Sequence, residues 1–329
     1  MKAKKFSYSK INTYKSCAWK YKLIYEDGHF INSESLASEL GTTVHFIEEQ
    51  IASAFKAGKK PDYDKLKDDL MNINIPKTSP QDVDGGIFGM NILKEKYKDE
   101  YFETDNEGKS YHTKIQDYLN HGIYRIENYL KENPDLEVYD MEKFFSIDFE
   151  GHVFSGFIDR IFHNTKTGEY IIEDIKTKGK PFSQEDLETP LQFVIYVLAL
   201  KDVLNVPEEK IICAYDLPFC NMKQGANTPG YIERGVALLK SYLENIGAKH
   251  FRPHPTPLCH WCQFCPTNKD QPEEGKNLCP YYSLWTRENK TREVSHKWRG
   301  MAYHDQIMLD EINKSQIAQK IDKKDDLDF

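Results

Sequence analysis

Residues 156–177 decide the fold, and they read Gly156-Phe-Ile-Asp-Arg-Ile-Phe-His-Asn-Thr-Lys-Thr-Gly-Glu-Tyr-Ile-Ile-Glu-Asp-Ile-Lys-Thr177. β-Branched and aromatic residues fill two runs, about 153–163 and 169–177, and the polar stretch Asn164–Gly168 separates them. This pattern predicts two strands joined by a turn. Further strands are predicted near 136–148 and over 211–217.

Charged side chains gather where these two strands end. Asp174 and Lys176 are two residues apart, so on a strand they project from the same face. If the turn is centred near Lys166, antiparallel pairing puts Asp159 across from Glu173 or Asp174. Carboxylate oxygens suit Mg²⁺ or Mn²⁺, and a lysine beside such an ion can orient or deprotonate a water. That combination serves hydrolysis of a phosphodiester, and the alternative is a solvated hairpin face with a salt bridge.

A helix follows these strands. The run Leu191–Leu200 comes after Pro190, and Gln192 and Tyr196 are four residues apart, hence on one helix face. The succession of a Gly-x-x-Asp-Arg strand, an Asp-x-Lys strand and a Gln-x-x-x-Tyr helix resembles the PD-(D/E)XK nucleases, specifically their RecB-like branch of phage and DNA-repair type. The usual proline before the first aspartate is Ile158 here. The resemblance covers the core and both chain ends, but not the segment from about 50 to 135.

The resemblance implies an α/β fold with a restriction-endonuclease-like core, in which helices flank a mixed central sheet. It also implies a metal site made by Asp159, Asp174 and the Ile175 carbonyl. Lys176 would position the attacking water and stabilise charge on the phosphate. Gln192 and Tyr196 would contact the DNA backbone and hold Lys176 in place.

A histidine completes the implied metal site. The stretch Leu36–Gln50 is predicted to be a helix, and Gly41-Thr-Thr-Val-His45 within it matches the Gly-x-x-x-His of the RecB-like branch. Without the resemblance, His45 reads as an ordinary core histidine. An imidazole beside carboxylates favours tolerance of Mn²⁺.

Five of the seven cysteines belong to a second pattern. Cys259, Cys262 and Cys265 follow one another at metal-ligand spacing, and Cys279 comes later in the chain. Four thiolates suit either Zn²⁺ or an iron–sulfur cluster, and this spacing does not choose between them. Cys213, within the strand predicted over 211–217, is expected to be buried.

The early Cys17 favours the iron–sulfur alternative through the resemblance. Many RecB-like nucleases hold a 4Fe–4S cluster with one early and three late cysteines, and Ser9-Lys-Ile-Asn-Thr-Tyr-Lys-Ser-Cys17 matches the early motif. The expected ligands are Cys17, Cys259, Cys262 and Cys279, with Cys265 as the alternative fourth ligand. The cluster would join the first helix to the C-terminal segment.

Composition limits the class of protein. The chain has 329 residues, 39% of them hydrophobic, and a net charge of −8, which argues against a generally basic nucleic-acid binder. The longest apolar run, 193–200, is too short to span a bilayer, and the N-terminus lacks the apolar core of a signal peptide. We therefore expect a cytoplasmic protein, of a bacterium or of a phage-infected cell.

The expected organisation has five parts along the chain. They are N-terminal helices of the core (1–50), a helical insertion or cap (51–135), the core with the active site (136–250), a cysteine-cluster segment (251–300), and a C-terminal helix with an acidic tail (301–329). Helices are predicted over 7–25, over 114–132 and over 229–248; the second of these ends before Asn133-Pro134.

The expected function is metal-dependent hydrolysis of DNA by an exonuclease on single strands or free ends, in recombination, repair or phage replication. The alternative is a DNA-end-binding iron–sulfur or zinc protein without significant catalysis. The tail that ends at Phe329 carries alternating acids. It is either a solvated terminus or a docking peptide for a replication or recombination protein.

Overall fold

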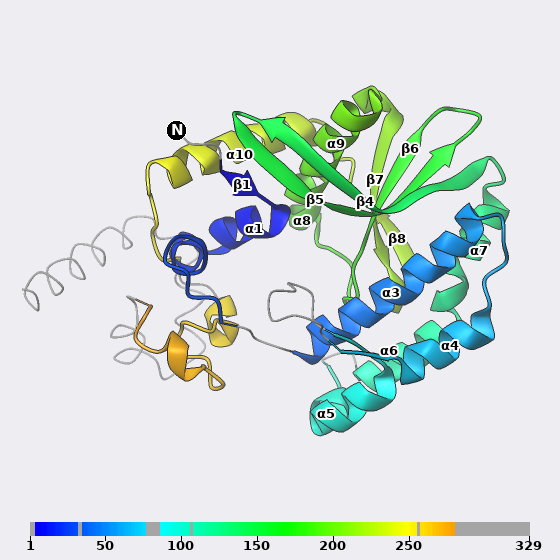
Figure 1. Cartoon of the computed structure of the whole chain (residues 1–329), viewed down its shortest axis with the longest axis horizontal. Coiled ribbons are helices and arrows are strands. Elements are labelled where there is room, and N and C mark those ends of the chain that lie inside the picture. The colour runs from blue at the N-terminus through cyan, green and yellow to red at the C-terminus, as the bar shows by residue number, and fades with distance from the viewer. Residues whose placement is uncertain (1–3, 32–34, 77–85, 106–107, 255–256, 280–329) are drawn as a thin grey trace, which may run out of the picture. The chain divides into compact units, whose positions relative to one another are not determined.

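The structure is a computed structural model that describes residues 4–31, 35–76, 86–105, 108–254 and 257–279 (Figure 1). The predicted C-terminal helix and acidic tail lie outside these residues. The chain divides into two compact units. We call them the sheet unit (Met1–Tyr8 with Glu34–Ser241) and the cysteine unit (Ser9–Ser33 with Tyr242–Phe329).

The sheet unit is built on a six-stranded mixed sheet in the order β1-β5-β6-β7-β8, with β4 also paired to β5. The β1–β5 and β6–β7 pairs are parallel, and the other pairs are antiparallel. The prediction of an α/β fold with a mixed sheet is confirmed. The strands of this sheet are β1 (Lys5–Phe6), β4 (Leu136–Phe149), β5 (His152–Asn164), β6 (Tyr170–Ile175), β7 (Ile211–Leu217) and β8 (Met222–Gly225). A separate two-stranded sheet contains β2 (Asn74–Ile75) and β3 (Ile87–Phe88).

The helices are α1 (Tyr8–Ser16), α2 (Ala18–Tyr21), α3 (Leu36–Lys56), α4 (Tyr63–Asn72), α5 (Met90–Phe102), α6 (Tyr111–Asn120), α7 (Arg125–Glu132), α8 (Gln184–Glu188), α9 (Leu191–Leu204) and α10 (Tyr231–Gly247). None of these described helices is long and apolar enough to cross a membrane.

Two helices predicted to be continuous are broken. The helix predicted over 7–25 is interrupted at Cys17, whose backbone is extended, and it continues after α2 as a π-helical turn. The helix predicted over 114–132 is interrupted between α6 and α7, where the Arg125 side chain binds the Gly122 carbonyl. A Cβ at Gly122 would lie 2.6 Å from the Tyr118 ring, so glycine allows this tight connection.

Helices cover both faces of the sheet. Neighbouring residues on a strand point to opposite faces; Glu173 of β6 shares a buried cluster with Glu48 of α3, whereas Asp174 lies against Tyr196 of α9. Helix α9 is buried around most of its circumference, as an apolar central helix must be. The sheet therefore lies between an α3 layer and an α9 layer.

The helices of the region predicted as an insertion pack onto α3. Leu66 and Leu70 of α4 and Leu93 of α5 belong to the same buried cluster as Leu40 of α3 and Phe162 of β5. At about 25 cal/mol per Å² of buried apolar surface, such shared burial joins these helices firmly to the core.

Strand β5 changes partner along one of its edges. Its residues 160–163 pair with β6, and its residues 153–154 pair with β1, while β4 follows the opposite edge along nearly the whole strand. Residues 155–159 therefore have no strand partner on this edge among the described residues. We call this opening the fork of the sheet.

Candidate metal centre

The two aspartates meet at the fork. Arg160 of β5 pairs with Glu173 of β6, so the same register continued by one residue puts Asp159 across from Asp174, one of the two positions that the sequence allowed. Here the strands separate, and the Ile175 N–H donates to Asp159 Oδ2 at 2.7 Å. A side-chain carboxylate thus replaces the missing backbone acceptor.

Asp174 is fully buried. Its Oδ2 lies 2.5 Å from Lys176 Nζ and has no hydrogen-bond partner among the described residues beyond this ion pair. Burial raises the pKa of Asp174 to about 6, with the neighbouring Asp159 adding to the shift and Lys176 opposing it. A buried carboxylate oxygen with so few partners suits a cation.

Lys176 lies one residue beyond the end of β6. Its backbone N–H still donates to the Asp216 carbonyl of β7, which continues the parallel ladder. Burial opposes the ammonium charge, but Asp174 and Asp159 outweigh burial and raise the pKa of Lys176 above its ordinary value. The side chain is therefore a fixed positive charge beside the two carboxylates.

His45 reaches the site from α3. Its Nε2 lies 3.0 Å from the Ile175 carbonyl oxygen, and its Nδ1 lies 3.8 Å from Asp159 Oδ2. With the proton on Nε2, the ring donates to the carbonyl and turns the Nδ1 lone pair toward Asp159, an arrangement typical of metal-binding histidines. Gly41, one turn earlier, allows a close approach because a Cβ there would lie 3.2 Å from the Thr177 hydroxyl oxygen.

Glu142 is a candidate metal ligand that sequence reasoning missed. One ligand atom from each of Glu142, His45 and Asp159 lies within 4.8 Å of the others, a spacing that a single cation could bridge. The backbone of Glu142 has φ 44°, in the left-handed region that few non-glycine residues adopt. The local sequence does not predict this angle, since Met-Glu-Lys inside a strand contains no residue typical of turns.

Gln192 and Tyr196 form a hydrogen-bonded pair on α9. Gln192 Nε2 donates to the Tyr196 hydroxyl at 2.8 Å, and the hydroxyl donates to Asp174 Oδ1 at 3.5 Å. Burial, with the charges of Asp174 and Asp159, holds the pKa of Tyr196 well above its ordinary value, so the phenol stays a donor. These hydrogen bonds connect the pair to Asp174. Both side chains are buried in the protein without DNA.

A buried charge cluster supports the site from the other face of the sheet. Arg160 donates to Glu173 at 2.6 and 2.9 Å, to Glu48 at 3.1 Å and also to Asp216. Arg125 donates to Asp216 at 2.8 and 3.2 Å. Burial opposes the charge of Asp216, but the two guanidinium groups outweigh burial and hold its pKa below its ordinary value. The cluster links β5, β6 and β7 to α3 and α7 directly behind the two aspartates.

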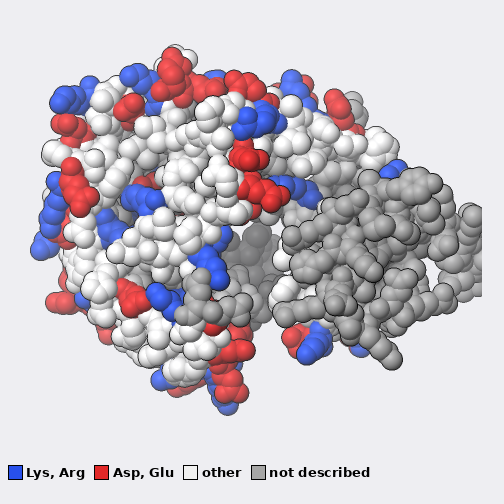
Figure 2. Space-filling model, turned by 180° about the vertical axis from the view of Figure 1, so that it is seen from behind, with Lys and Arg blue, Asp and Glu red and all other residues white. Residues whose placement is uncertain are grey.

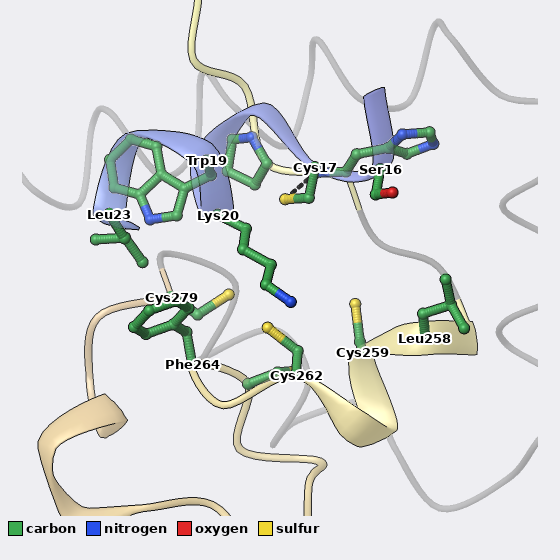
Figure 3. Close-up of a pocket in the computed structure, with 13 residues that line it drawn as sticks. Ser16, Cys17, Trp19, Lys20, Leu23, Leu258, Cys259, Cys262, Phe264 and Cys279 are labelled. Atoms are coloured by element: carbon green, nitrogen blue, oxygen red, sulfur yellow. Dashed lines mark hydrogen bonds between the residues drawn. The ribbon is translucent and has the colours of Figure 1, made fainter. Parts of the chain in front are cut away.

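The cysteine unit contains a second site. Figure 3 shows Cys259, Cys262 and Cys279 around a pocket, with Cys17 across from them and the Lys20 side chain extending among the sulfur atoms. Cys265 also lines this pocket, so all five candidate cysteines gather there. In contrast, Cys213 is fully buried on β7 of the sheet unit, as predicted.

Tight turns explain the Cys-x-x-Cys-x-x-Cys spacing. The N–H groups of Cys262 and Cys265 donate to the carbonyls of Cys259 and Cys262, at 3.1 and 3.0 Å. Successive three-residue turns bring every third side chain to the same side. At Cys17, the extended backbone lets the sulfur accept from the His254 N–H at 3.4 Å. Hydrogen bonds from Cys259 and Cys279 lower the pKa of the Cys265 thiol to about 3.

The N-terminal helices are fastened to the later part of the cysteine unit. The Tyr14 hydroxyl donates to the His250 carbonyl at 2.7 Å, and Trp19 Nε1 donates to the Leu278 carbonyl at 3.0 Å. Tyr14 and Tyr21 are buried and belong to the core of this unit.

Sequence comparison identifies the family. The profile of the PD-(D/E)XK nuclease superfamily matches residues 5–267. The chain therefore belongs to this superfamily, whose members use divalent metal ions such as Mg²⁺. No curated protein matches the chain.

Two solved structures give distant likenesses. One is a protein from Eubacterium rectale, provisionally named an exonuclease; it is 11% identical, with 81% of this chain and 88% of that chain covered and a TM-score of 0.42. Another is SSO0001, which is 18% identical, with 54% and 79% covered and a TM-score of 0.26.

Proposed function

We propose that this protein is a metal-dependent DNA nuclease of the RecB-like branch that acts as an exonuclease on single strands or free ends. The observation that carries the proposal is the convergence of Asp159, Asp174, His45 and Lys176 at the fork. Superfamily membership supports a nuclease, and the fork supplies the carboxylate, imidazole and ammonium groups that phosphodiester hydrolysis needs.

The proposed metal ligands are Asp159, Asp174, Glu142 and His45 Nδ1. The Ile175 carbonyl, the further ligand that the resemblance implies, would join this set only if its hydrogen bond with His45 Nε2 opened, because Nδ1 and Nε2 point to opposite sides of the ring. This donor set of oxygens with one nitrogen fits Mg²⁺ or Mn²⁺. When bound, the cation supplies a Lewis acid that polarises a phosphoryl oxygen.

The remaining groups act around that ion. The Lys176 ammonium orients the attacking water and balances negative charge on the phosphate. Tyr196, held by Gln192, fixes Asp174 through its hydroxyl. The Lys176 backbone is hydrogen-bonded to β7, Asp174 contacts α9 through Tyr196, and the two side chains form an ion pair. Asp174 and Lys176 are therefore already in position before a substrate binds.

Cleavage of end-labelled DNA tests the proposal. Wild-type protein with Mg²⁺ or Mn²⁺ should shorten single-stranded DNA from an end, and Asp174→Ala should abolish cleavage while the fold and DNA binding persist. Asp135→Ala is the matched control, because Asp135 is an exposed carboxylate ion-paired to Lys166 at the far end of the β5–β6 hairpin. Equal cleavage by wild type and Asp174→Ala would reject the assignment.

For the cysteine unit we propose a 4Fe–4S cluster, with Zn²⁺ as the alternative. The ligands would be Cys17, Cys259, Cys262 and either Cys279 or Cys265. The common pocket of these five thiols supports the proposal, and the His254 N–H on Cys17 is the kind of hydrogen bond that tunes a cluster thiolate. Anaerobic iron and zinc analysis of single Cys→Ser variants separates the metals and identifies the fourth ligand.

The competing function is DNA-end binding without significant catalysis. The complete set of ionisable groups at the fork favours catalysis, and the assay above distinguishes the two functions. A docking role for the acidic tail that ends at Phe329 stays a proposal about residues outside the described part. Deleting 325–329 and measuring partner binding and cleavage tests it.

A further inference from the structure

Two exposed phenylalanines lie side by side on the β4–β5 hairpin. Phe144 and Phe157 are cross-strand partners, 56% and 53% exposed, with ring centroids 5.4 Å apart and an angle of 59° between the rings. Single exposed apolar residues are ordinary on protein surfaces, but a contiguous aromatic pair is a candidate binding surface. We call this pair the aromatic step.

The aromatic step adjoins the metal centre. Phe157 lies two residues before Asp159 on β5, and Phe144 lies two residues after Glu142 on β4. Two residues along a strand span about 7 Å. On β5 the intervening Ile158 is buried, so Phe157 and Asp159 lie on the less buried side of the strand. Phe157 also lies within the fork, where β5 has no strand partner on one edge.

We propose that the aromatic step stacks against a nucleobase of the substrate, next to the phosphate held at the metal centre. This inference rests on the proposed nuclease function and names how that site would bind its substrate. A separation of about 7 Å is about two steps of a stacked strand, which rises about 3.4 Å per nucleotide. A base close to the bound phosphate would therefore reach the rings.

Stacking favours a particular substrate form. Each base on an aromatic ring contributes about 1–3 kcal/mol, with little dependence on its identity. Inside a duplex both faces of every base are covered by neighbouring pairs, whereas a single strand or an opened end has faces free. The aromatic step therefore selects single-stranded or frayed ends without selecting a sequence.

The test measures binding apart from cleavage. A Lys176→Met background with Mg²⁺ is titrated with a short fluorescent single-stranded oligonucleotide and with the same strand made abasic near its end. Adding Phe144→Leu and Phe157→Leu should weaken binding of the intact strand by about tenfold, as expected for the loss of one stacked base. Binding of the abasic strand, which is already weak, should not change.

Further variants keep the result interpretable. Phe102→Leu, which changes an exposed phenylalanine on α5, is the matched control. It should leave the affinity for the intact strand and for the abasic strand unchanged. Phe157→Trp should keep or raise affinity for the intact strand, because a larger ring still stacks. Each single Leu variant is measured as well, and thermal unfolding in the absence of DNA checks the fold.

Two outcomes would overturn the inference. Equal losses for intact and abasic strands would mean that the pair acts through the phosphates or the fold, and unchanged binding of both would exclude contact with bases. If wild-type protein failed to cleave DNA while base-dependent binding persisted, the nuclease proposal would fail and the aromatic step would stand.

Discussion

Lys176 carries the fixed positive charge of the metal centre. Replacing it with Met keeps the length of the side chain and removes the charge, so we expect cleavage to fall by about 100-fold or more. Mn²⁺ binding should persist or tighten, because a cation repels the ammonium. Isothermal titration and a cleavage time course measure the two effects.

Lys178 provides the control for this change. Its ammonium lies 3.6 Å from the centroid of the Phe182 ring, and it is two residues further along the same segment. Lys178→Met should cleave like wild type. Weakened Mn²⁺ binding in Lys176→Met would instead indicate that the lysine organises the carboxylates.

In the proposed metal centre, Asp174 should make metal binding depend on pH. Burial, with the charge of Asp159, raises its pKa to about 6, so the carboxyl is protonated below that pH and a cation must displace the proton. Mn²⁺ affinity should be level above about pH 6 and fall by roughly tenfold per unit below it. Titrations across this range check the profile. An unchanged profile in Asp174→Asn would assign the effect to another group.

Glu142 holds its carboxylate in place at the expense of backbone strain. A left-handed angle costs a residue with a Cβ about 1–2 kcal/mol, and glycine avoids most of that cost. Glu142→Gly should therefore unfold in urea with about 1 kcal/mol more stability than Glu142→Ala, both without metal. Both variants should bind Mn²⁺ more weakly than wild type. Equal stabilities of the two variants would argue against strain.

At the scale of elements, the buried charge cluster connects the strands to the helices behind the site. Arg160→Met would leave Glu48, Glu173 and Asp216 buried with too few positive partners, and we expect a loss of about 3–5 kcal/mol in the free energy of unfolding. Lys143→Met removes an ion pair with Asp140 at a partly exposed position and should cost less than about 1 kcal/mol. Chemical denaturation of both variants gives the comparison.

The elements that sequence could predict are those with local signals. The β5–β6 hairpin follows from two β-rich runs and a polar turn, and the turn position narrowed the partner of Asp159 to Glu173 or Asp174. Glu142 could not be found in this way. The position of its carboxylate depends on the irregular strand β4, whose register with β5 shifts between Val138 and Asp140. It also depends on the left-handed backbone of Glu142, which no neighbouring turn residue predicts.

Partners that are far apart in sequence also escaped prediction. Arg160 meets Glu48 and Asp216 across 112 and 56 positions, and only the folded sheet brings these groups together. The break at Cys17 has the same origin, because its sulfur accepts from the backbone of His254. Helical periodicity alone therefore predicted a continuous helix there.

At the scale of the whole molecule, net charge and DNA binding need not conflict. The face in Figure 2 carries lysine and arginine interspersed with aspartate and glutamate rather than one broad basic area. With a net charge of −8, recognition would depend on local groups such as the metal centre and the aromatic step. We expect a weaker salt dependence of binding than for a strongly basic protein.

The proposed metal cluster of the cysteine unit should stabilise that unit selectively. If the cluster is present, Cys262→Ser should lose the metal and become sensitive to limited proteolysis within 9–31 and 242–279, because the metal–thiolate bonds that would join the parts of the unit are lost. Residues 35–241 should stay protected and should still bind Mn²⁺. Mass spectrometry of the fragments locates the cuts, with Cys213→Ser as a control that retains the metal. Cuts spread evenly over both units would contradict the prediction.

The division of the cysteine unit has a consequence during protein synthesis. Its first part, Ser9–Ser33, is synthesised before residues 34–241, and its second part begins at Tyr242. At roughly 5–20 residues per second, the intervening stretch of about 200 residues takes roughly 10–40 s to make. During that interval the nascent Cys17 has none of its later thiol neighbours. Loading of the proposed cluster would therefore be a late event, after the whole sheet unit has emerged.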